Sequence, residues 1–191
     1  MVLVVAITGS TGVIYGIRLL EALRSLKIET HLIISPNGEI TIKYETDRSV
    51  SEVRSLASFS YRADDMAARI SSGSFKTDGM IVAPCTVKTL SALASSYTDN
   101  LIIRAGDVTL KERRKLVLVV RETPLHLGHI RNMERVAEMG AIILPPVPAF
   151  YTRPQKLSDI VDYTVGKILD AFGIEHDLFP RWDGISGQGS K

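Results

Sequence analysis

Short apolar runs rich in β-branched residues alternate along the chain with longer segments of helical periodicity. The runs predict strands at residues 3–7, 30–34, 80–83, 116–120 and 141–144, because buried strands read as continuous apolar stretches. Helices are expected in the intervals and, last, at about residues 157–172. Such alternation pairs the strands in parallel. The pattern therefore predicts an α/β fold, a Rossmann-like, doubly wound and mainly parallel sheet flanked by helices.

The segment after the last expected helix has a different composition. Residues 173–191 carry Pro180, Trp182 and glycines at positions 184, 187 and 189, so we expect no core element there. A length of 191 residues fits one domain. We predict a single domain over residues 1–182 and a flexible tail over residues 183–191.

Composition and charge narrow the range of partners. A net charge of +2 is too small for the basic stripe typical of nucleic-acid binding. The sequence contains no apolar run of about 18 residues, so we expect no membrane span. The basic segment of a secretory signal is also missing after Met1. The single Cys85 excludes an internal disulfide and fits a reducing compartment. We expect a cytoplasmic protein that binds a small molecule and neither nucleic acid nor a membrane.

A glycine-rich turn follows the first expected strand. Residues 8–12 read Thr-Gly-Ser-Thr-Gly, and the helix after them offers unpaired N–H groups to a phosphate. The third glycine falls at Gly16, which does not fit a dinucleotide fingerprint, and Ser35 ends the second strand where an acidic residue would bind a ribose diol. A hydroxyl there suits the phosphate or ribityl chain of FMN. The alternative is an ordinary turn with a Ser or Thr N-cap.

Two further strand ends carry polar residues. Residues 84–89 read Pro-Cys-Thr-Val-Lys-Thr and form a second donor-rich turn at the same crevice. Cys85 is more typical of a small buried hydrophobe than of a nucleophile.

Arg121 and Glu122 follow the apolar run 116–120, so their charges are expected to point into the crevice. Glu112, Arg113 and Lys115 form either a solvated face or salt bridges between subunits.

Two histidines and a tyrosine have competing interpretations. His126 and His129 lie three residues apart on one helical face, but no third ligand stands nearby. We expect helix capping or packing there and no metal site. Tyr151 follows the proline-rich residues 145–150, which either fix its hydroxyl for binding or pack its ring within the loop.

Four sequence blocks, APCTVKT, LKERR, RETPLHLGHIRNM and PPVPAFY, closely resemble the flavin prenyltransferase (UbiX) family. The resemblance spans about residues 3–182 and implies a flavoprotein fold. It implies metal-independent transfer of a dimethylallyl group from dimethylallyl monophosphate to N5 and C6 of reduced FMN. The prenylated FMN would pass to a separate decarboxylase of quinone biosynthesis or aromatic-acid degradation. A homododecamer with sites completed between subunits is also implied.

The turns and the resemblance together give a candidate site. FMN contacts are expected at Gly9, Ser10, Thr11, Ser35, Thr86, Val87, Lys88, Thr89 and Arg121. The resemblance implies that the donor phosphate is held by Arg104, Lys111, Tyr151 and Lys167, and that the catalytic carboxylates are Glu122 and Glu45. Thr11 stands where many members have serine, and Lys167 replaces an arginine. Because lysine cannot form a bidentate fork on phosphate, the choice between monophosphate and diphosphate stays open.

Three other functions fit the same fold. A flavin-containing decarboxylase of peptidyl cysteine would need a PxMNxxMW-type motif, which the sequence lacks. Direct decarboxylation of an aromatic acid is the second. A non-catalytic FMN carrier is the third, and it would need neither the basic residues nor Glu122.

Overall fold

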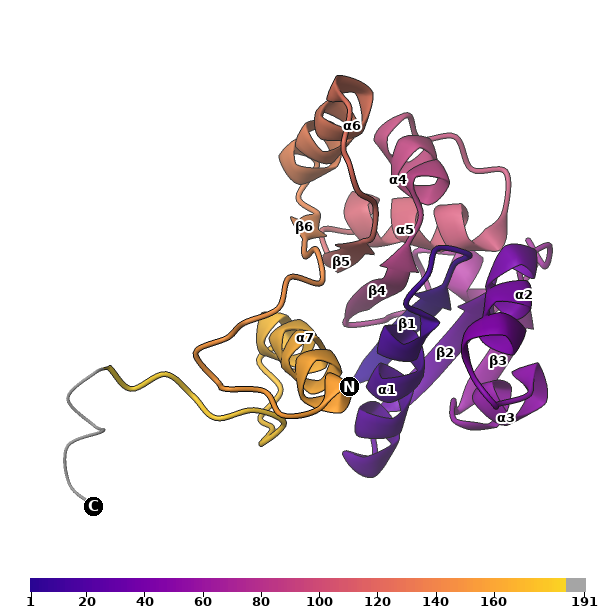
Figure 1. Ribbon diagram of the computed structural model, residues 1–191. Coiled ribbons are helices and arrows are strands. Elements are labelled where there is room, and N and C mark those ends of the chain that lie inside the picture. Colours follow the sequence, from indigo (N-terminus) through magenta and orange to yellow (C-terminus); the bar gives the residue numbers. More distant parts are fainter. Residues whose placement is uncertain (185–191) are drawn as a thin grey trace, which may run out of the picture. The chain divides into compact units, whose positions relative to one another are not determined.

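The computed structural model describes residues 1–184, so that most of the tail predicted at residues 183–191 lies outside the described part. The chain divides into two compact units, Met1–Pro146 and Val147–Lys191. In Figure 1 the first unit runs from indigo to orange and the second continues from orange to yellow. The single domain expected over residues 1–182 stays a prediction.

The first unit contains a parallel sheet of six strands among the described residues. They are β1 (Val2–Ile7), β2 (Glu29–Ile34), β3 (Phe59–Arg62), β4 (Gly79–Cys85), β5 (Lys115–Val120) and β6 (Ile142–Ile143). Their order is β3-β2-β1-β4-β5-β6, and each neighbouring pair is parallel. The strand order reverses between β1 and β4, as in a doubly wound sheet. The predicted fold class is confirmed.

Helices cover both faces of this sheet. They are α1 (Val13–Ser25), α2 (Pro36–Glu45), α3 (Val50–Ser55), α4 (Val87–Ala94), α5 (Leu101–Lys111) and α6 (Leu127–Glu138), with a 3₁₀ turn at Arg69–Ser71. In Figure 1, α1 lies in front of the sheet and α5 behind it. Strand side chains alternate between these layers, since Val4 and Ala6 share a core cluster with residues of α5, whereas Ile7 meets Gly16 of α1. A Cβ at Gly16 would lie 2.2 Å from the Ala83 carbonyl oxygen, so only glycine lets α1 lie this close.

Two strands differ from the sequence-based expectation. The edge strand β3 reads Phe-Ser-Tyr-Arg and is mostly exposed, so no apolar run marks it. The expected strand at residues 141–144 is reduced to Ile142–Ile143. The other four strands each begin one residue earlier than predicted, and β4 continues through Cys85.

The second unit contains α7 (Leu157–Phe172), which is the predicted last helix. Gly173 ends this helix with φ 69°, a left-handed conformation that suits glycine. Ile174 and Phe179 are buried, so the expectation of no core element after the last helix is wrong for these two residues. A Cβ at Gly166 would lie 2.5 Å from Phe179 Cε1, so a glycine in α7 makes room for this ring.

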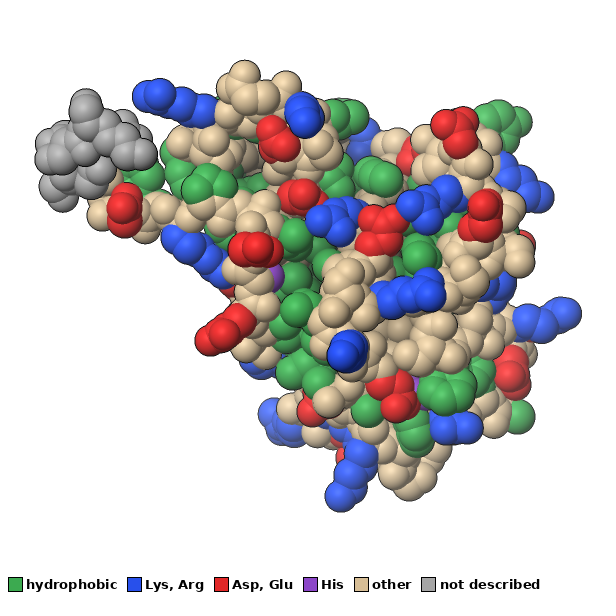
Figure 2. All heavy atoms as spheres, turned by 90° about the horizontal axis from the view of Figure 1, so that it is seen from below, with side chains coloured by type: hydrophobic (Ala, Val, Ile, Leu, Met, Phe, Trp, Pro, Cys, Tyr) green, Lys and Arg blue, Asp and Glu red, His purple; other side chains and the backbone are tan. Residues whose placement is uncertain are grey.

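The surface carries charges of both signs. Figure 2 shows Lys and Arg side chains interspersed with Asp and Glu side chains over one face, in keeping with the net charge of +2. Within the described part of the chain, no helix is long and apolar enough to span a bilayer.

Candidate functional site

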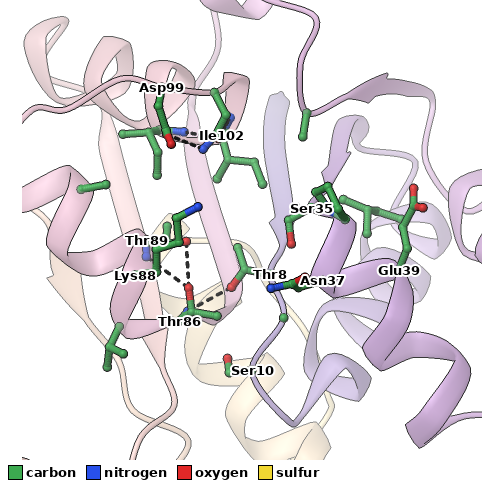
Figure 3. A pocket seen from close by; sticks show the side chains of 18 of the residues that line it. Thr8, Ser10, Ser35, Asn37, Glu39, Thr86, Lys88, Thr89, Asp99 and Ile102 are labelled. Atoms are coloured by element: carbon green, nitrogen blue, oxygen red, sulfur yellow. Dashed lines mark hydrogen bonds between the residues drawn. The ribbon is translucent and has the colours of Figure 1, made fainter.

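A cavity of about 850 Å³ lies at the carboxyl edge of the sheet in the first unit. The residue that follows each of four adjacent strands lines it: Ser35 after β2, Thr8 after β1, Thr86 after β4 and Arg121 after β5. Gly9, Ser10, Asn37, Val87, Lys88, Thr89 and Glu122 are also part of its lining. Figure 3 shows the side chains of Ser35, Thr8 and Thr86, from three of these strand ends, gathered in one place. Open α/β sheets bind ligands at this edge, where the strand order reverses.

Thr8 connects the first two turns of the site. Its hydroxyl donates to the Pro84 carbonyl at 2.7 Å and accepts from the Thr86 N–H at 3.0 Å, as the dashed line in Figure 3 shows for Thr86. The residue is only 2% exposed, so the two bonds are shielded from water. The sequence pattern placed Thr8 in the glycine-rich turn but assigned it no contact, because its partners lie far away along the chain.

Ser10 and Gly9 bring the first turn up to the start of α2. A Cβ at Gly9 would lie 2.4 Å from Asn37 Cβ, so glycine allows the close approach of this turn to α2. Ser10 Oγ is buried and has no hydrogen-bond partner among the described residues. Buried hydroxyls are almost always paired. An unpaired hydroxyl in the lining of a cavity therefore points to a ligand with polar oxygens.

Two helices begin at the cavity. The N-cap of α2 is Ser35, whose Oγ accepts from the Gly38 N–H at 3.0 Å. The N-cap of α4 is Thr86, whose Oγ1 accepts from the Thr89 N–H at 3.1 Å and donates to Thr89 Oγ1 at 3.0 Å. The first N–H groups of a helix lack intrahelical partners, and the helix dipole favours negative charge there. Two helix starts in one cavity make it suited to a phosphate.

The start of α1 is occupied differently. The N–H groups of Gly12 and Val13 donate to Glu45 Oε2 at 2.8 and 3.2 Å. The carboxylate of Glu45 thus takes the place where the sequence predicted a phosphate. Thr11 is exposed, and neither Thr11 nor Glu45 is among the residues that line the cavity.

Arg121 and Glu122 bring charge to the cavity. The Arg121 N–H donates to the Cys85 carbonyl at 3.2 Å, which continues the pairing of β5 with β4. The Glu122 carboxylate is exposed and accepts from the Thr123 N–H at 3.0 Å. Both residues line the cavity. A cation and a carboxylate are therefore available beside any ligand bound there.

Cys85 and His126 have structural roles, and the His129 ring packs against that of His126 at a centroid distance of 3.6 Å. Cys85 is fully buried, and burial raises the pKa of its thiol to about 12, so the interpretation as a core residue is confirmed. His126 is the N-cap of α6 and its Nδ1 accepts from the Gly128 N–H at 3.0 Å. The capping interpretation is thus confirmed as well. In the part of the chain that the structure describes, no cluster of three His, Cys, Asp or Glu side chains could hold a metal ion.

Arg104 and Lys111 lie on α5 and do not line the cavity. Arg104 Nε donates to the Ser71 carbonyl at 3.0 Å, and its Nη1 lies 3.0 Å from Asp107 Oδ2. Lys111 forms an ion pair with Glu112. The first unit alone therefore does not bring these two cations together with Glu122.

Tyr151 and Lys167 belong to the second unit. The Tyr151 ring contacts Tyr163 and Trp182 edge-on at centroid distances of 6.1 and 5.6 Å. Burial raises the pKa of Tyr151, and the nearby charge of Lys167 opposes that shift. This unit therefore brings the two predicted phosphate ligands within electrostatic reach of each other.

Comparisons with known proteins cover almost the whole chain. Residues 1–169 match the family model described as Flavoprotein. The chain is 57% identical over 185 residues to the flavin prenyltransferase UbiX of Escherichia coli strain K12, covering 95% of this chain and 98% of the relative.

Two solved structures are similar to the chain over nearly its full length. The crystal structure of AnUbiX in complex with FMN and dimethylallyl pyrophosphate has a TM-score of 0.95 and 54% identity, and the match covers 96% of this chain and 97% of that one. A dodecameric FMN-dependent UbiX-like decarboxylase from Escherichia coli O157:H7 has a TM-score of 0.95 and 50% identity, covering 96% and 100%.

Proposed function

Because the chain belongs to the UbiX family of flavin prenyltransferases, we propose that it transfers a dimethylallyl group from dimethylallyl monophosphate to N5 and C6 of reduced FMN. The observation that carries this proposal is the near-complete match to AnUbiX, which was crystallised with FMN and a prenyl donor. The prenylated FMN serves a separate decarboxylase. The dodecameric relative supports a homododecameric assembly, and a cytoplasmic location stays a prediction.

The residues of the cavity fit FMN. The unpaired Ser10 hydroxyl and the starts of α2 and α4 offer donors to its phosphate. Ser35 follows β2 at the position where a dinucleotide site would carry a carboxylate, and the cavity volume lies within the usual range for ligand sites. We assign the FMN contacts to Gly9, Ser10, Ser35, Thr86, Val87, Lys88, Thr89 and Arg121, while the contact expected at Thr11 stays a prediction.

The chain has four tasks in this reaction. Reduced FMN supplies the nucleophilic atoms, and the protein aligns it with the donor and excludes water. Cations stabilise the negative charge that grows on the phosphate as the allylic carbon–oxygen bond breaks. We assign this stabilisation to the Lys167 ammonium and, from a neighbouring copy, to Arg104 and Lys111, and we assign to the Tyr151 hydroxyl a hydrogen bond to the same phosphate. Glu122, at the cavity, is the proposed acid and base.

Anaerobic incubation with reduced FMN and dimethylallyl monophosphate tests the proposal. Mass spectrometry of the extracted flavin should detect a mass increase of one five-carbon prenyl unit. The matched control omits the donor. If the protein binds FMN but the flavin mass is unchanged with the donor present, the proposed transfer is wrong and an FMN carrier fits better.

Direct decarboxylation of an aromatic acid is the second candidate, because one relative at 50% identity bears the name UbiX-like decarboxylase. The two functions differ in their products. A decarboxylase releases carbon dioxide from the acid with FMN alone, whereas a prenyltransferase releases none without its partner enzyme. Measuring carbon dioxide with and without a purified partner decarboxylase separates them.

A further inference from the structure

A second cation lies beside Lys167 in the second unit. The Asp170 carboxylate oxygen Oδ2 lies 3.5 Å from Lys167 Nζ and 2.7 Å from Arg181 Nη1. Arg181 comes from the segment after α7, which folds back onto the helix through this ion pair. One carboxylate thus holds two cations, and the three charged side chains together keep one net positive charge.

His176 fixes the Asp170 carboxylate. The His176 side chain is only 3% exposed, and its Nδ1 accepts from the Leu178 N–H at 3.2 Å. In a neutral ring the proton therefore sits on Nε2, which lies 3.2 Å from Asp170 Oδ1 and donates to it. The hydrogen bond from Arg181 is the main cause that lowers the pKa of Asp170. Asp170 is thus a charged and oriented anchor for Arg181.

Arg181 is anchored but still accessible. Its guanidinium carbon lies 4.8 Å from the centroid of the Phe179 ring, which supports the group from one face. The Arg181 side chain is 53% exposed. A guanidinium has five N–H donors. Nη1 donates to Asp170. Nη2 lies 3.1 Å from Nε2 of His176, but this nitrogen carries the ring proton and cannot accept a hydrogen bond from Nη2. Donors of Arg181 are therefore left for a ligand.

Tyr151 lies within electrostatic reach of the same two cations. Burial raises the pKa of the Tyr151 phenol, whereas the charges of Lys167 and Arg181 both act to lower it. Trp182, the residue after Arg181, packs edge-on against the Tyr151 ring at 5.6 Å. A phenol, an ammonium and a guanidinium are thus grouped within one unit of the chain.

We propose that Arg181 is a further ligand of the donor phosphate and that Asp170 positions it. This inference rests on the proposed function, in which Tyr151 and Lys167 bind that phosphate. An ammonium is a point charge, whereas a guanidinium can hold two phosphate oxygens at once. Arg181 therefore supplies the fork that is lost where lysine stands at position 167. It forms no covalent bond and stabilises the phosphate before and after it leaves.

Donor affinity of the Arg181→Ala variant tests this role. Calorimetric titration of dimethylallyl monophosphate into protein loaded with oxidised FMN avoids product formation. We expect about tenfold to a hundredfold weaker donor binding, with Arg181→Lys in between and FMN affinity unchanged. Arg135→Ala removes an exposed arginine from α6 as the matched control. Donor binding equal to that of the wild type in Arg181→Ala overturns the proposal.

Asp170→Asn separates positioning from simple charge. Removing the carboxylate makes the cluster more positive, so a purely electrostatic cluster would bind phosphate more tightly. If Asp170 positions Arg181, the variant instead binds the donor more weakly, and adding Arg181→Ala weakens binding little further. Tighter binding overturns the positioning role. Wild-type protein that makes prenylated FMN while both variants bind the donor normally would contradict this inference and leave the proposed function intact.

Discussion

At the scale of single residues, removing the unpaired hydroxyl of Ser10 is expected to have opposite effects on protein stability and on FMN binding. An unsatisfied buried polar group costs the folded state its desolvation energy, so replacing it with an apolar atom is neutral or stabilising. A hydroxyl that donates to a phosphate is worth about 1.5–3 kcal/mol, or about tenfold to a hundredfold in affinity.

We therefore expect Ser10→Ala to keep or raise the thermal midpoint of the FMN-free protein while weakening FMN binding by that factor. Scanning fluorimetry and calorimetric titration measure the two effects. Ser10→Thr keeps the hydroxyl as a control. A lowered midpoint with unchanged FMN affinity would mean that Ser10 has a structural role only.

Glu122 is expected to be needed for catalysis but not for binding. Glu122→Gln keeps the size of the side chain and removes its ionisable proton site, which for a general acid or base costs about a hundredfold or more. Single-turnover mass spectrometry of the flavin should detect this loss while FMN remains bound. Rates equal to those of the wild type across the pH range would refute the role.

Glu45 allows a sharper comparison, because its carboxylate caps α1. If capping is its role, Glu45→Gln keeps an acceptor oxygen and retains activity within a few fold, whereas Glu45→Ala loses about 1 kcal/mol of unfolding free energy. Single-turnover rates and urea unfolding of the two variants provide the test. A loss in Glu45→Gln as large as that in Glu122→Gln would support the catalytic role that the resemblance implies.

The sequence predicted which residues line the cavity where these residues directly follow an apolar run. Ser35, Thr86 and Arg121 each follow such a run, and each lines the cavity. The contacts of Thr8 were not predicted, because its hydroxyl bonds connect residues 76 and 78 positions apart. A contact of that kind depends on the pairing of β1 with β4, and no local pattern reports it.

At the scale of elements, the N-cap of α4 serves both the fold and the site. The Thr86 hydroxyl accepts from the Thr89 N–H and donates to the Thr89 hydroxyl. Thr86→Ala should cost about 1 kcal/mol of unfolding free energy, the usual value of an N-cap, and should also weaken FMN binding. Thr86→Ser keeps the cap and should preserve both. Urea unfolding and FMN titration measure them, and an alanine variant as stable as the serine variant would exclude a capping contribution.

Elements were predictable to the extent that their burial is uniform. The strands β1, β2, β4 and β5 are almost fully buried and read as apolar runs. The edge strand β3 is buried on neither side of its pleat, so its sequence carries no such signal. The sequence also does not show that the Glu45 carboxylate, and not the predicted phosphate, lies at the start of α1. This contact depends on where α2 ends.

At the scale of the whole molecule, the predicted site residues fall into groups that one chain does not unite in the cavity. The predicted FMN contacts other than Thr11 line the cavity together with Glu122, whereas Arg104 and Lys111 lie outside its lining. Exposed apolar side chains such as Leu127, Ile130 and Phe150 are of the kind that a neighbouring copy covers. The position of the cavity at this edge of the sheet follows from topology, whereas the proposed sharing of residues between copies depends on interfaces that local sequence patterns do not encode.

Subunit complementation tests this sharing. Glu122→Gln and Arg104→Ala are each expected to be nearly inactive alone. In a mixed oligomer, a site with intact Glu122 from one chain and intact Arg104 from a neighbour should form in about one quarter of cases if equal amounts assemble at random. Co-expression with two different tags, purification of the mixed oligomer and measurement of prenylated FMN should therefore recover about a quarter of wild-type activity.

The same experiment has a clear opposite outcome. If Glu122 and Arg104 act within one chain, no chain in the mixed oligomer has both residues intact, and activity stays at the average of the two separate variants. Combining both substitutions in one chain and pairing it with the wild type gives the matched control, because that mixture has the same composition. If the site is shared between chains, this control mixture also has about one quarter of the wild-type activity. If the site lies within one chain, the control mixture keeps about half of it. The two mixtures together decide whether Arg104 reaches the cavity of a neighbouring copy.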